Sequence, residues 1–131
     1  MNSRFAGLGI LVASTLFAAG AAMAGTKRSA TVTIDNVSRT ATGSLSAVRA
    51  STDINQTIGC VIISESGTLS ANCLARDAAG TTRNCTTSQP THLQAIATLQ
   101  GDSQLIFSWN ALGACVRIAI TNDSTFAPKA P

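Results

Sequence analysis

The fold is decided by residues 57–74, which read TIGCVIISE, then SG, then TLSANCL. The first segment is a β-branched apolar run, and the last alternates apolar and polar residues as half-buried strands do. The pair Ser66-Gly67 between them suits a two-residue hairpin turn. Counting outward from this turn places Cys60 opposite Cys73 at a non-hydrogen-bonded position. There the Cα atoms approach to about 4.5 Å, which a disulfide can bridge.

A second hairpin follows at once. Residues 77–80, DAAG, have Asp first and Gly fourth, which is typical of a type I turn. This hairpin would place Cys73 opposite Cys85 at a hydrogen-bonded position, where side chains stand further apart. We therefore prefer the disulfides Cys60–Cys73 and Cys85–Cys115. Four cysteines allow three connectivities, and the other two stay open at this point.

A third hairpin is predicted by residues 110–113, NALG, which repeat the turn pattern between the strand-like segments 105–109 and 114–120. In that register Trp109 lies across from Cys115. A large ring beside a disulfide is a common packing arrangement in β domains. We interpret this single tryptophan as a core residue rather than as a ligand contact.

The first 24 residues predict a cleaved secretory signal peptide over residues 1–24. Arg4 lies in a short polar start, residues 7–19 are an apolar centre, and the end matches the A-x-A pattern of signal peptidase sites. We expect a mature chain that begins near Gly25, is periplasmic or secreted and has no membrane span. An oxidising compartment also suits an even number of cysteines in a small domain.

We divide the remaining chain into a single β-rich domain, 25–121, and an extended C-terminal tail, 122–131, with two prolines and no periodicity. Within the domain, residues 30–35 alternate cleanly and predict a strand. Residues 37–42 are typical of a turn. Residues 43–50 alternate less well and predict a weaker strand at a sheet edge.

One helix is predicted over residues 90–100, where apolar residues recur at helical spacing from Leu93 onward. Pro90 stands where a first helical turn accepts it, and Gly101 follows as a stop. The expected fold is mainly β. It is a small antiparallel β-sandwich or open barrel with one short helix, stabilised by disulfides.

The charges do not favour nucleic acid as a partner. Nine basic and six acidic residues are spread along the chain, and aromatic residues make up only 4% of it. A nucleic-acid interface would gather basic residues on one face and add aromatic rings for stacking. Arg76, Asp77 and Arg83 lie around the second turn. We interpret them as solubilising charges, with a partner-contact loop as the functional alternative.

Catalytic and metal signals are weak. Gly101-Asp102-Ser103 resembles the opening of a Gly-Asp-Ser-Leu hydrolase motif, but Gln104 replaces its leucine. A serine nucleophile needs a base within hydrogen-bond reach, and the only histidine, His92, lies on the predicted helix as an exposed first-turn residue. The cysteines lack the close pairs of zinc sites and of thiol oxidoreductases. We expect no enzyme activity, no metal and no cofactor.

These observations favour a non-catalytic binding or structural module of the bacterial cell envelope or extracellular space. Its partner would be an envelope or extracellular protein or glycan. Exposed aromatic platforms for sugar stacking are not evident, although Thr, Asn and Ser side chains could bind glycans by hydrogen bonds. The alternative is an inhibitor of a secreted hydrolase, which would present the rigid loop 76–83 to its target.

Overall fold

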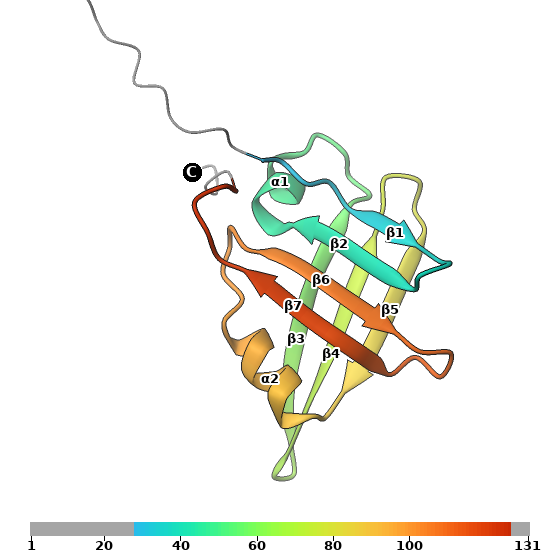
Figure 1. Ribbon diagram of the computed structural model, residues 1–131, viewed down its shortest axis with the longest axis vertical. Helices are drawn as coiled ribbons and strands as arrows, with labels where there is room; N and C mark the ends of the chain where they lie inside the picture. The colour runs from blue at the N-terminus through green and yellow to red at the C-terminus, as the bar shows by residue number, and fades with distance from the viewer. Residues whose placement is uncertain (1–27, 127–131) are drawn as a thin grey trace, which may run out of the picture.

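Two antiparallel sheets lie face to face in the computed structural model, which describes residues 28–126 (Figure 1). The four-stranded sheet has the order β1-β2-β6-β7 and comprises β1 (Thr33–Asp35), β2 (Thr40–Ser44), β6 (Gln104–Trp109) and β7 (Cys115–Thr121). The three-stranded sheet has the order β3-β4-β5 and comprises β3 (Thr57–Glu65), β4 (Thr68–Arg76) and β5 (Thr82–Thr87). The predicted mainly β sandwich is confirmed, and within the described residues the sheets do not close into a barrel.

The first hairpin, β3–β4, has the predicted register. Ser66 and Gly67 form its turn with positive φ angles of 49° and 79°, the conformation that a tight two-residue β-turn requires. Cys60 pairs with Cys73, and the two are joined by a disulfide with their Cα atoms 4.0 Å apart. This spacing is that of a non-hydrogen-bonded pair.

The other two hairpin turns are also as predicted. The backbone N–H of Gly80 donates to the carbonyl of Asp77 at 3.0 Å, and that of Gly113 donates to Asn110 at 3.1 Å. The second disulfide joins Cys85 on β5 to Cys115 on β7, so it links the two sheets. The preferred disulfide connectivity is therefore confirmed.

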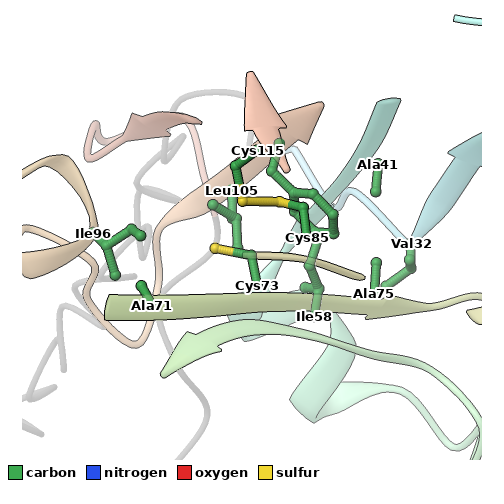
Figure 2. Close-up of a cluster of buried hydrophobic side chains, with 11 residues drawn as sticks. Val32, Ala41, Ile58, Ala71, Cys73, Ala75, Cys85, Ile96, Leu105 and Cys115 are labelled. Carbon is green, nitrogen blue, oxygen red and sulfur yellow. A yellow bond between two sulfur atoms is a disulfide. The ribbon is translucent and has the colours of Figure 1, made fainter. Parts of the chain in front are cut away.

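The core lies between the two sheets, around the disulfide that links them (Figure 2). Small side chains on β4 (Ala71, Cys73 and Ala75) and large ones on β6 (Leu105 and Phe107) are each 2% exposed or less. Large side chains opposite small ones can pack closely between two sheets. Both sheets thus contribute buried side chains to the core.

Trp109 packs at the margin of this core. Its ring centroid lies 6.0 Å from that of Phe107, and it is half-buried against the buried cluster. The register places it opposite Cys115, as predicted. Trp109 therefore belongs to the core on one side while its other side meets solvent.

The weak strand predicted over residues 43–50 is wrong beyond Ser44. Residues Leu45–Ala50 form helix α1, whose N-cap is Ser44, with its Oγ accepting from the N–H of Ala47 at 3.5 Å. Serine is a preferred N-cap, and leucine, alanine and arginine are good helix formers. The strand that precedes it, β2, begins inside the predicted turn and lies between β1 and β6 rather than at an edge.

The predicted helix exists as α2 (Pro90–Ala97), three residues shorter than expected. Its buried residue is Ile96, whereas Ala97, expected on the same face, is exposed. The helix contacts β7, β3 and β4 at one end of the sandwich (Figure 1). The described residues thus hold two short helices, not the single one predicted.

The predicted signal peptide, 1–24, lies outside the described residues, and so does the end of the predicted tail. The described part of that tail packs onto the start of the domain. Phe126 is buried and forms a bridge with Arg28, whose N–H donates to the carbonyl of Thr125 at 2.6 Å. Neither helix within residues 28–126 has the length and apolarity needed to cross a membrane.

Candidate functional site

The serine of the weak hydrolase motif has a structural position. Ser103 is fully buried, its Oγ donates to Oδ1 of Asn122, and the same Oγ accepts from the N–H of Gln100 at 2.7 Å. The Asn122 side chain in turn donates to the carbonyl of Thr98 at 3.0 Å. These bonds tie the end of α2 to the end of β7. The hydroxyl of Ser103 is thus occupied by the chain itself.

His92 lies in the first turn of α2, as predicted, but it is half-buried rather than exposed. Its Nδ1 lies 3.0 Å from Oγ1 of the buried Thr87 in a hydrogen bond. The same Thr87 oxygen accepts from the N–H of Gln89 at 3.2 Å. Within residues 28–126, His92 and Ser103 share no hydrogen-bond partner. The contact therefore anchors the first turn of α2 to the end of β5.

A polar hollow of about 400 Å³ lies near the end of β7, lined by Gln100, Asp102, Asn122, Asp123 and Ser124. Hydrogen bonds from the hydroxyl and the N–H of Thr125 hold the pKa of Asp123 below its ordinary value. No group of three or more His, Cys, Asp or Glu side chains gathers anywhere in the described residues. The hollow is an open polar depression with two carboxylates beside it.

The predicted partner-contact loop is built as a rigid turn, but its charges do not converge. Oδ1 of Asp77 accepts from the N–H of Thr81 at 2.8 Å, which fixes the turn. The register pairs Arg76 with Thr82 and Arg83 with Ala75, so the two arginines leave the sheet on opposite faces.

Arg83 crosses from the three-stranded sheet to the other one. Its Nε donates to Oδ1 of Asn36, in the turn between β1 and β2, at 2.8 Å. Its Nη1 donates to the carbonyl of Thr82 at 2.8 Å. Arg83 thus serves as a link between the sheets at their rim, while Arg76 is exposed on the outer face.

A different surface, on the β3–β4 hairpin, presents apolar side chains to solvent. Because side chains alternate along a strand, Val61, Ile63 and Leu74 point to the face opposite the buried Ala71 and Cys73. They are 53%, 44% and 40% exposed. A hollow of about 370 Å³ lies on this part of the hairpin, lined by Thr57, Ile58, Gly59, Cys60, Val61, Asn72 and Leu74.

The end of the hairpin also exposes apolar residues that face inward. Ile62 and Leu69 lie on the core side of the sheet but are 40% and 50% exposed. Figure 1 shows why, because the tip of the β3–β4 hairpin projects past α2 and beyond the four-stranded sheet. We call the five exposed residues the hairpin patch: Val61, Ile62, Ile63, Leu69 and Leu74.

A second hollow, of about 500 Å³, separates the hairpin tip from α2 and extends the apolar surface. It is lined by Gly67, Thr68, Leu69, Ser88, Pro90, Leu93 and Gln94. Glu65 is the only charged residue between Thr57 and Ala75. The hairpin therefore combines exposed apolar surface with almost no charge.

Our sequence reasoning missed this surface, although one signal for it is present. Val61-Ile62-Ile63 places three apolar residues in a row on a strand. With a side-chain period of two, at least one of them must face away from the core. A polar residue would be expected there if that face met only water.

No protein-family model, curated protein or solved structure matches this chain. The function must therefore be inferred from the chemistry of its own surface.

Proposed function

We propose that the protein is a small exported binding or structural module, without catalytic activity, that docks a protein partner on the hairpin patch. The observation that carries the proposal is that Val61, Ile63 and Leu74 share the outer face of one hairpin and are each at least 40% exposed. The other two patch residues, Ile62 and Leu69, are exposed on the opposite face near the hairpin tip. Other exposed large apolar residues, such as Val37 and Leu112, lie singly on turns. Scattered apolar residues are normal on a surface, whereas a contiguous patch marks an interaction site.

The patch is held rigid before any partner arrives. The disulfide Cys60–Cys73 crosslinks the two strands of the hairpin next to Val61. Nine consecutive residue pairs connect β3 to β4 without a bulge. A preorganised surface loses less conformational entropy on binding, so more of the contact energy appears as affinity.

The composition of the hairpin supports a protein partner with an apolar surface. Because Glu65 is its only charge, the hairpin offers little to a charged ligand. Exposed aromatic rings for sugar stacking are also lacking on the outer face of β3 and β4. The two disulfides support a place in an oxidising compartment, which is the cell envelope or the extracellular space.

The test is capture of partners by the immobilised protein from an envelope extract and from culture supernatant. The variant Val61→Thr/Ile63→Thr/Leu74→Thr keeps β-compatible residues while removing the apolar character of the outer face. The control is Val116→Thr, a residue of β7 that is 57% exposed outside the patch. We expect wild type and control to capture the same proteins and the triple variant to lose them. Capture that is unchanged in the triple variant, with both variants folded, would contradict the proposal.

The alternative function, inhibition of a secreted hydrolase, is favoured by one observation. The second turn is rigid, because Asp77 bonds within it and the Asn55 side chain donates to the carbonyl of Ala78 at 3.2 Å. Protease inhibitors present preorganised loops of this kind. Inhibition of a captured hydrolase that is lost in Arg76→Ala, but kept in the outer-face triple variant, would select this alternative.

Catalysis remains testable in the same samples. Turnover of a panel of generic esters and peptides by the purified protein would overturn the non-catalytic proposal if it disappears in Ser103→Ala. The comparison requires that Ser103→Ala remain folded, which circular dichroism reports.

A further inference from the structure

The free edge of β3 carries backbone groups that point away from its neighbour. β3 is an edge strand of its sheet. In an antiparallel pair, residues alternate between those whose N–H and C=O bond to the partner and those whose groups point outward. Cys60 and Cys73 have the close Cα spacing, 4.0 Å, of a non-hydrogen-bonded pair. The backbone groups of Cys60 therefore point outward, and those of Ile62 and Ser64 follow at a period of two.

These outward groups have no partner in the described part of the chain, where no hydrogen bond uses the N–H of Cys60, Ile62 or Ser64. The other edge strands differ from β3 in length, charge or pairing. The N–H of Thr86 on β5 donates to the carbonyl of Gly113 at 3.0 Å. β1 has only three residues, and β7, with seven, carries the charged Arg117. β3, with nine residues, is thus the longest edge strand in residues 28–126.

Nothing in the sequence of β3 protects this edge. Soluble proteins block edge strands with lysine, proline, bulges or inward charges. Residues 57–65 contain no lysine or proline, their pairing with β4 has no bulge, and the only charge, Glu65, stands at the turn. The exposed Val61, Ile62 and Ile63 lie on the same stretch. An open backbone ladder and apolar side chains therefore coincide.

We propose that a second copy of this chain pairs with β3 along this edge, strand to strand and antiparallel. A two-fold axis at Ile62 places Ile62 of the two copies opposite one another and Cys60 opposite Ser64 of the other copy. Cys60, Ile62 and Ser64, the residues with open backbone groups, then pair only with one another. The product is one continuous six-stranded sheet with the order β5-β4-β3-β3-β4-β5.

Side-chain chemistry favours this register. Across the new strand pair, Val61 of one copy meets Ile63 of the other on the outer face, and the two Ile62 side chains meet on the inner face. Such β-branched cross-strand pairs stabilise sheets. Glu65 meets Gly59, so no like charges oppose one another. A two-fold axis nearer the start of β3 would bring Ile58 into the new strand pair, and Ile58 is already buried within its own chain, at 7% exposure.

The size of the interface sets its strength. One strand pair with its flanking side chains falls at the low end of specific interfaces, below about 1,200 Å² in total. The dimer should therefore form reversibly as concentration rises. Its outer face would join the Val61 and Ile63 side chains of two hairpins into one strip. Strand pairing uses the backbone edge of β3 and the inner-face Ile62, whereas docking of a partner would use the outer face with Val61, Ile63 and Leu74, so the two can be tested separately.

The first test is sedimentation of the purified protein from micromolar to millimolar concentration. We expect wild type to shift from monomer to dimer and Ile62→Lys to stay monomeric, because two lysines would meet at the two-fold axis. Val116→Lys, a matched change on exposed β7, should dimerise like wild type. A wild type that stays monomeric throughout, or a dimer that persists in Ile62→Lys, overturns the proposal.

A second measurement needs only the wild-type protein. Amide hydrogen exchange, followed by NMR at low and high concentration, should show new protection at Cys60, Ile62 and Ser64. The amides of Val61 and Ile63 already bond to β4 and should not change. Protection that appears instead on β5 or β7, or without this alternation, means association through another surface and overturns the proposal.

Discussion

Removal of the disulfide between the sheets should destabilise the protein more than removal of the disulfide within the hairpin. Cys60 and Cys73 are 13 residues apart and lie on neighbouring strands, whereas Cys85 and Cys115 are 30 residues apart and join the two sheets. A crosslink stabilises mainly by restricting the unfolded chain, and more so for longer loops. For loops of these lengths the chain-entropy relation gives about 2.9 and about 3.6 kcal/mol at 25 °C.

The burial of the cysteines also makes the disulfide between the sheets the more costly one to remove. Cys73 and Cys85 are both 0% exposed, but their partners differ, because Cys115 is 5% exposed and Cys60 is only half-buried. Replacement of a buried sulfur by the hydrogen of alanine leaves a cavity that the surroundings fill only in part. We therefore expect the free energy of unfolding to fall by about 3 kcal/mol without the hairpin disulfide and by about 4 kcal/mol or more without the other.

The assay is guanidinium unfolding of wild type, Cys60→Ala/Cys73→Ala and Cys85→Ala/Cys115→Ala, each followed by circular dichroism. Alanine avoids the buried hydroxyl that serine would introduce. Comparison of both the midpoint and the slope of each transition separates a loss of stability from a change in the unfolded state. If removal of Cys60–Cys73 lowers the free energy of unfolding as much as removal of Cys85–Cys115 does, the disulfide between the sheets has no special importance and our reasoning is wrong.

Three further predictions concern single positions. Gly43→Ala should destabilise the protein by about 1–3 kcal/mol, since its added Cβ would lie 3.2 Å from core side chains, whereas Gly59→Ala, with nothing within 4 Å, should be close to neutral. Thermal unfolding of the two variants measures the difference, and equal stabilities would contradict it. Thr42→Val should stabilise by about 1 kcal/mol, because the buried Oγ1 of Thr42 has no hydrogen-bond partner within the described residues; an unchanged or lower denaturation midpoint would refute this. The Ser38 hydroxyl and backbone N–H lower the pKa of Asp35, so the stabilisation is present above the ordinary value of 3.8 and is lost as pH falls through the lowered pKa. In Ser38→Ala the pKa of Asp35 should rise toward its ordinary value, as an NMR titration of the carboxyl carbon will show, and an unmoved titration would disprove the role of Ser38.

The hairpin patch and the open edge of β3 bear on solubility as well as on binding. A long, apolar edge strand that stays unpaired promotes uncontrolled association. Pairing with a second copy about a two-fold axis closes this edge, because each copy uses the same strand and none is left over. A closed dimer would therefore limit the growth of larger assemblies.

Local chemistry in the sequence was enough to predict the hairpins and their crosslinks. The turns at Ser66-Gly67, at residues 77–80 and at residues 110–113 depend on which residues tolerate positive φ or favour a type I turn. Once a turn is fixed, counting outward fixes the register. The register placed Cys60 opposite Cys73 and left Cys85 for Cys115.

The errors arose where local signals were weak. Residues 45–50 lack clear alternation, and the cap at Ser44 turned them into α1 rather than an edge strand. His92 was predicted to be an exposed residue of the first helical turn, yet Thr87 on β5 lies within hydrogen-bonding distance of it. That contact joins segments whose approach the sequence pattern does not reveal.

The sequence by itself determined the three hairpins and their registers, since these follow from turn residues and a side-chain period of two, and it favoured the disulfide pairing that the structure has. It did not determine that β2 lies between β1 and β6. Only the tertiary structure decided what is exposed. Ile58 and Ile62 point to the same face of β3, yet one is 7% exposed and the other 40%. The physical reason is that the two sheets differ in length. The β3–β4 hairpin extends past the four-stranded sheet and helix α2, so its end is left uncovered.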